Sequence, residues 1–131
     1  MGDLSVSVIS TKNFNPVTDP KLKCMCGNEG CDERSVTQSV LNRVQRVRYD
    51  AGRPLTITSG GRCSNHEDEV SRATPADHQN CVAVDVAVSG GVERMEIVSL
   101  GIKYGATAIG VASTFVHLGW RKDAQPVMWT Y

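Results

Sequence analysis

The sequence predicts one α+β domain in which helices pack on a small, mainly antiparallel sheet. Three observations predict this fold: an amphipathic helical pattern after residue 35, a strand of alternating character at 81–88, and further short apolar segments near the C-terminus. A length of 131 residues suits one domain with a core and is short for two. We therefore expect a single domain over 1–131 that begins with an irregular, cysteine-containing arm at 1–34.

The composition excludes several classes of protein. Basic and acidic residues balance at 14 each and 40% of residues are hydrophobic, which argues against disorder and against a protein that coats nucleic acid. No apolar run has the length of a membrane span, and the first 16 residues lack the pattern of a signal peptide. We expect a soluble monomer, made in a cytoplasm, with no nucleic-acid or membrane partner.

The arm at 1–34 contains prolines and a cluster of cysteines, Cys24, Cys26 and Cys31. Three thiolates at this spacing could hold a structural zinc ion, with a fourth ligand from Cys63, His66 or Cys81. The alternative is a set of partly buried free thiols in a loop-rich arm. The total of five cysteines is odd, so they cannot all pair within one chain.

The helices and strands follow in order after the arm. Apolar residues at helical spacing predict a helix that begins after Ser35 as N-cap and ends at Gly52, with Val36, Val40, Val44 and Val47 on its buried face. Its arginines suit a solvated face. Beyond this helix the pattern predicts strands at 55–58, 81–88, 108–111 and 115–120, a polar loop at 62–80, a helix at 92–104, and an extended tail packed on the body.

Alternation within the strands places chemistry on one face of the sheet. Valines occupy the core side of 81–88 and Asp85 the other side, while His117 has the same position in its own strand. His78 lies an odd number of residues before Asp85, so a turn at 79–80 must bring it to that face. Two histidines and a carboxylate, with a fourth position for water, are typical of catalytic zinc. The alternative is a surface histidine and an edge aspartate.

Three motifs in order resemble the zinc D-Ala-D-Ala carboxypeptidase and phage endolysin peptidase family, which shares the hedgehog fold. They are Ser59-Gly60-Gly61-Arg62-Cys63-Ser64-Asn65-His66, then His78, Ala83 and Asp85, then Phe115-Val116-His117. The resemblance extends over residues 12–131. It implies a DD-peptidase-like fold with zinc on the open face of the sheet, bound by His78, Asp85 and His117.

The resemblance also implies that Arg62 faces the substrate cleft, where a guanidinium can hold a stem-peptide carboxylate. The alternative for Arg62 is an ordinary surface ion pair. His66 is expected to support the loop rather than to bind metal. The implied function is hydrolysis of a peptide bond in bacterial peptidoglycan, in a phage lysis enzyme or a virion-borne enzyme that acts on the wall after release.

The chain departs from the family pattern at several positions. Ala76 replaces a serine and Cys81 a glycine, while Thr114 and Gly119 stand where relatives carry a glutamate and an aspartate. We expect Cys81 to fill space as a buried apolar residue, although it could pair with Cys63 under oxidising conditions. Threonine cannot accept a proton from water at neutral pH, so the general base must come from elsewhere. The weak candidates are Asp77, Glu67 and Asp123.

Two other functions remain open from the sequence. Without a general base, the domain could be a non-catalytic zinc-binding module that recognises the cell wall or serves in a virion. It could also be a bacterial carboxypeptidase that acts on free D-Ala-D-Ala-type peptides.

Overall fold

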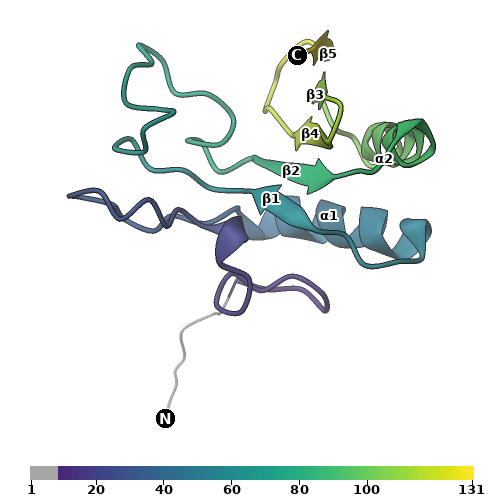
Figure 1. Cartoon of the computed structure of the whole chain (residues 1–131), viewed down its shortest axis with the longest axis horizontal. Coiled ribbons are helices and arrows are strands. Elements are labelled where there is room, and N and C mark those ends of the chain that lie inside the picture. Colours follow the sequence, from purple (N-terminus) through teal and green to yellow (C-terminus); the bar gives the residue numbers. More distant parts are fainter. Residues whose placement is uncertain (1–8) are drawn as a thin grey trace.

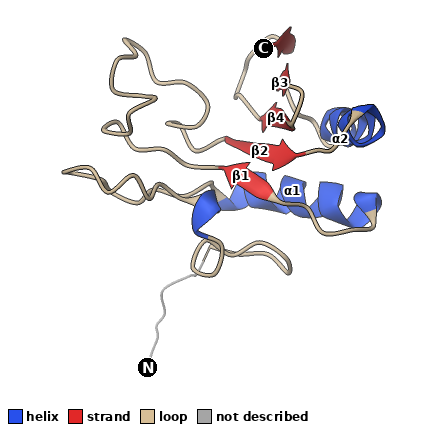
Figure 2. Cartoon of the chain, viewed as in Figure 1, coloured by secondary structure: helices blue, strands red, loops and turns tan. Residues whose placement is uncertain are grey.

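The computed structural model describes residues 9–131. The first eight residues of the arm, and the expectation that no signal peptide begins there, lie outside the described residues. The elements, in chain order, are a 3-10 helix η1 (Pro20–Leu22), helix α1 (Gln38–Ala51), strands β1 (Ile57–Ser59) and β2 (Ala83–Ala87), helix α2 (Gly91–Lys103), and strands β3 (Ala108–Val111), β4 (Phe115–Gly119) and β5 (Val127–Thr130). Figure 1 shows α1 running alongside β1 and β2, and Figure 2 shows how much of the first half is loop.

The five strands form one mixed sheet in the order β1-β2-β4-β3-β5. The pairs β1–β2, β2–β4 and β3–β4 are antiparallel, whereas β5 lies parallel to β3. The α+β class is confirmed, and the expectation of a mainly antiparallel sheet is correct for β1 to β4. The parallel strand β5 is the part that the sequence prediction described only as an extended tail.

Helix α1 begins two residues later than the sequence predicts. Thr37 is the N-cap and its side chain accepts a hydrogen bond from the Val40 amide. Ser35, the predicted cap, is instead paired with Lys23 in a β-bridge, so that prediction is wrong. Gly52 ends the helix as predicted, in the left-handed conformation with φ 69° that glycine adopts without steric cost.

The core lies between the helices and one face of the sheet. Val84 and Val86 of β2 are fully buried there, as the alternation predicted, together with the valines of α1. Helix α2 approaches β4 closely because Gly101 has no side chain: a Cβ at that position would lie 2.5 Å from the Leu118 side chain. The opposite face of the sheet carries Asp85 and His117.

The described second half of the arm packs against the loop that follows β1. Leu22 is fully buried, and its carbonyl accepts hydrogen bonds from the amides of Val36 and Gly61. A Cβ at Gly60 would lie 2.7 Å from the Leu22 carbonyl oxygen, and one at Gly61 would overlap the Arg34 carbonyl. Two glycines are therefore needed where the arm crosses this loop. Among residues 9–131, no helix is long and apolar enough to cross a membrane.

Candidate metal centre

Asp85 and His117 are direct partners across the β2–β4 ladder, so their side chains point from the same face of the sheet. The Nδ1 atom of His117 lies 3.0 Å from Oδ1 of Asp85. Both side chains are buried. The convergence that strand alternation predicted for these two residues is what the structure places here.

A turn before β2 brings His78 to the same point. The amide of Cys81 donates to the His78 carbonyl, and Cys81 itself has a left-handed backbone with φ 63°. This reversal breaks the strand, as the odd spacing between His78 and Asp85 required. Nε2 of His78 lies 3.3 Å from Oδ1 of Asp85, and the two imidazoles meet edge to face at 4.9 Å.

The donor set of these three residues fits zinc. One ligand atom from each of His78, Asp85 and His117 can be chosen so that all lie within 4.8 Å of one another. Nδ1 of His78 lies 2.7 Å from the Gly60 carbonyl oxygen and donates its hydrogen there, which leaves Nε2 free as a ligand. Two imidazole nitrogens and one carboxylate oxygen form a common zinc ligand set that leaves a coordination position open.

Asp77 holds the far side of the His117 ring. Its Oδ2 lies 2.9 Å from Nε2 of His117, and its Oδ1 accepts a hydrogen bond of 2.7 Å from Nε of Arg121. A Cβ at Gly119 would lie 2.8 Å from Oδ2 of Asp77, so the glycine makes room for this carboxylate. The contact leaves Nδ1 of His117 directed at Asp85, as a carboxylate–histidine–metal arrangement requires.

The ionisation of the three buried groups follows from these contacts. Burial opposes ionisation of Asp77, yet hydrogen bonds from His117 and Arg121 lower its pKa to about 2. Burial likewise opposes ionisation of Asp85, and the two histidines lower its pKa to about 2. Burial also disfavours the charged form of His117, but Asp77 and Asp85 outweigh it and raise the His117 pKa.

The candidate ligands His78, Asp85 and His117 line a cavity of about 350 Å³ together with Arg62 and Glu69. Nη1 of Arg62 lies 3.3 Å from Oε2 of Glu69, whose side chain is fully buried. Nε of Arg62 and Oε1 of Glu69 are buried without a hydrogen-bond partner among the described residues. Arg62 thus lines the cavity, and it is paired with a carboxylate that sequence reasoning missed. Glu69 lies in a polar loop without periodicity, and no sequence signal distinguishes it there.

Strand β5 supplies a wall of the cavity that the sequence did not predict. The indole of Trp129 lies 5.1 Å from the His117 ring, and Tyr131 packs against Phe115 at the same distance. A Cβ at Gly110 would lie 2.7 Å from the Trp129 indole. An isolated glycine inside a strand often marks a place where another group packs closely on the backbone. Gly110 was therefore the sequence signal that could have indicated this wall.

The remaining predicted residues lie elsewhere. Glu67, Asp123 and Thr114 do not line this cavity. His66 accepts a hydrogen bond at Nδ1 from the Asp68 amide, so it supports the loop and belongs to neither metal-ligand group of the described residues. Cys24, Cys26 and Cys31 come together with Cys63 rather than with His66 or Cys81.

The comparison with protein families bears on the three motifs together. The sequence model of the family described as Peptidase M15 matches residues 16–119, a range that contains the second half of the arm, all three motifs and the whole candidate metal centre. A comparison with curated protein sequences found no match. The family match extends over most of the chain, which therefore belongs to the Peptidase M15 family, the zinc D-Ala-D-Ala carboxypeptidase-like peptidases.

Proposed function

We propose that this protein is a zinc-dependent peptidase that cleaves a peptide bond in bacterial peptidoglycan, with His78, Asp85 and His117 as the zinc ligands. The observation that carries the proposal is the buried Asp85–His117 pair, joined by His78, beside a cavity that also contains an arginine. Membership of a family of zinc peptidases supports the reaction class. When bound, zinc supplies Lewis-acid activation of water and of the scissile carbonyl.

The chain's own residues have separate roles in this proposal. Asp77 orients His117 through Nε2, and both of its oxygens are already engaged, so it is a positioning residue rather than the base. Arg62 binds a carboxylate of the stem peptide, which its unpartnered Nε supports.

Glu69 is the carboxylate we propose as the general base. Three carboxylates line the cavity: Asp85 is a metal ligand, Asp77 is occupied, and Glu69 has an oxygen without a hydrogen-bond partner. Substrate that takes over the Arg62 guanidinium would release Oε2 of Glu69 from its ion pair. The expected sequence of events is that a substrate carboxylate binds Arg62 and Glu69 then accepts a proton from water.

For the cellular setting, we propose a phage lysis enzyme that acts on the cell wall after release from the host cytoplasm, or a virion-borne enzyme. The three-motif resemblance supports it. The competing function is a zinc-binding wall-recognition module without hydrolysis. One observation favours that alternative: the Glu69 carboxylate already pairs with two arginines, Arg62 and Arg72, each at 3.3 Å, so it is not free to contact a water molecule.

Release of muropeptides from purified peptidoglycan separates the two functions. We expect zinc-loaded wild-type protein to release peptide fragments and His78→Asn to release none, because asparagine can still donate to Gly60 but offers no Nε2 ligand. His66→Asn is the matched control: it keeps an acceptor for the Asp68 amide and should retain activity. Equal background release by all three proteins, with binding to the wall retained, would establish the recognition module instead.

A further inference from the structure

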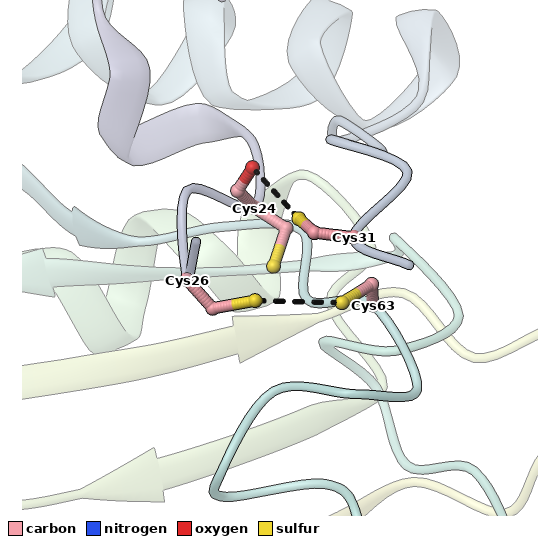
Figure 3. Close-up of side chains that lie close together, drawn as sticks. All are labelled: Cys24, Cys26, Cys31 and Cys63. Carbon is pink, nitrogen blue, oxygen red and sulfur yellow. Dashed lines mark hydrogen bonds between the residues drawn. The ribbon is translucent and has the colours of Figure 1, made fainter. Parts of the chain in front are cut away.

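Four of the five cysteines meet at one point of the molecule. Cys24, Cys26 and Cys31 come from the arm, and Cys63 comes from the loop after β1 (Figure 3). Their four sulfur atoms all lie within 4.8 Å of one another. Cys24 and Cys63 are 99% buried, and the other two are partly exposed. This sulfur cluster is separate from the candidate metal centre and shares no residue with it.

The sulfur atoms are placed as ligands of one metal ion would be, and not as disulfide-bonded pairs. Sγ of Cys26 and Sγ of Cys63 lie 3.7 Å apart, whereas a disulfide bond joins its sulfurs at about 2.05 Å. A zinc–sulfur distance of about 2.3 Å in a tetrahedral site places the sulfurs about 3.8 Å apart. The observed separation of this pair therefore equals the edge of a zinc–thiolate tetrahedron.

The surrounding groups suit a charged thiolate site. The Asn28 amide donates to Sγ of Cys26 at 3.5 Å, the kind of supporting hydrogen bond that orients a thiolate ligand. Lys21, Lys23 and Arg62 line a cavity of about 260 Å³ that Cys24 and Cys26 also line. Four thiolates around one zinc ion leave a net charge of −2, which nearby cations stabilise.

Cys81 is excluded from the sulfur cluster by its position. Its thiol is buried and directed at the Gln79 carbonyl, at 3.8 Å. The odd cysteine count thus divides into four clustered cysteines and one that fills space. Cys81 also provides a natural control, since it is a buried cysteine of the same chain outside the sulfur cluster.

From these observations we propose that Cys24, Cys26, Cys31 and Cys63 bind a structural zinc ion that fastens the arm to the loop carrying Arg62. On binding, each thiol loses its proton to solvent and four zinc–sulfur bonds form, with no change of oxidation state. Four protein ligands leave no open position, so this ion is structural and not catalytic. Because Cys63 follows Arg62 directly, the site fixes the backbone that presents Arg62 to the cavity.

Counting metal per chain tests the site without any assay of activity. After loading with zinc under reducing conditions and removal of excess metal, we expect two zinc ions per wild-type chain. Cys26→Ser, a change at a partly exposed position, should retain one, while Cys81→Ser should retain two. A count of one in the wild type with the His78 and His117 ligands intact would overturn the proposal.

X-ray absorption at the zinc edge keeps the test decisive if a cysteine variant fails to fold. In the double variant His78→Asn/His117→Asn only the sulfur cluster should hold metal, and its zinc should show four sulfur neighbours and no nitrogen or oxygen. A nitrogen or oxygen shell, or no bound zinc, contradicts the site. Loss of the catalytic zinc alone leaves this sulfur signal in place, so the two sites fail independently.

Discussion

Nε2 of His117 and Oδ2 of Asp77 lie 2.9 Å apart, on the side of the ring opposite to the candidate metal ligands. This contact fixes which ring nitrogen faces Asp85, and hence which nitrogen can bind metal. Asp77 is therefore next to one candidate ligand, His78, in the sequence, but contacts the other candidate ligand histidine, His117, in the structure.

Replacing Asp77 with asparagine should weaken metal binding without abolishing it. The amide can still accept from His117 but lacks the charge that makes the imidazole a stronger ligand, and losing such a partner costs about 10–100-fold in affinity. Competition for zinc with a chromogenic chelator measures it. Unchanged affinity in Asp77→Asn would show that the contact has no role in binding.

Glu69→Gln should separate chemistry from metal binding. We expect kcat for muropeptide release to fall by about 100-fold or more, because glutamine cannot accept the proton. The zinc content should equal that of the wild type, since Glu69 is not a ligand. Retained kcat in a zinc-loaded Glu69→Gln protein would remove Glu69 from the reaction.

Gly119→Ala should disturb the centre from outside the ligand set. The new methyl group would lie 2.8 Å from Oδ2 of Asp77 and 3.2 Å from Nε2 of His117, so the carboxylate must move. We expect zinc affinity to fall by about tenfold, as for loss of the Asp77 contact. Gly91→Ala is the matched control, because the nearest atom there is the flexible end of Arg94, at 3.7 Å. Equal zinc affinity in the two alanine variants would contradict the expected displacement.

Cys81 has a left-handed backbone conformation that glycine adopts without steric cost. Its φ of 63° costs a residue with a side chain about 1 kcal/mol or more relative to glycine. Cys81→Gly should therefore be more stable than Cys81→Ala by about 1 kcal/mol in denaturant unfolding. Both variants lack the thiol, so the difference isolates the backbone term, and the opposite order of stability would contradict it.

Acid should destabilise the metal-free protein through Asp77 and Asp85. The pKa of each carboxyl falls from its ordinary 3.8 to about 2 in the folded chain. A carboxyl group whose pKa is lower in the folded chain than in the unfolded chain stabilises the fold at pH values above the unfolded pKa. That contribution is lost as pH falls from about 4 toward about 2. In urea unfolding with a chelator present, the stability difference between wild type and Asp77→Asn should shrink across this range. A constant difference would show that the Asp77 carboxylate does not stabilise the fold.

The sequence predicted both α-helices, the strands β1 to β4 and the face of the sheet that carries the candidate metal centre. Alternation in β2 placed Val84 in the core and Asp85 opposite it, because strand periodicity is a local property. The partners of these residues were harder to predict. Glu69 and Trp129 reach the cavity through a loop and an edge strand, whose paths depend on long-range packing rather than on any local pattern.

Cysteine spacing indicated three candidate ligands within the arm but left the fourth open. The choice of Cys63 over His66 or Cys81 depends on how the arm crosses the loop after β1, which Gly60 and Gly61 permit by having no side chains. Cys63 and His66 are only three positions apart in the chain, so spacing alone could not decide between them.

The segment from Gly60 to Cys63 has a fixed length for four separate reasons. Gly60 and Gly61 lie against the arm, Arg62 extends into the cavity, and Cys63 reaches the sulfur cluster. Adding or deleting one residue would shift all four out of place together. Residues 73–75 are all exposed, so the chain should tolerate inserted residues or a reporter peptide there but not between Gly60 and Cys63.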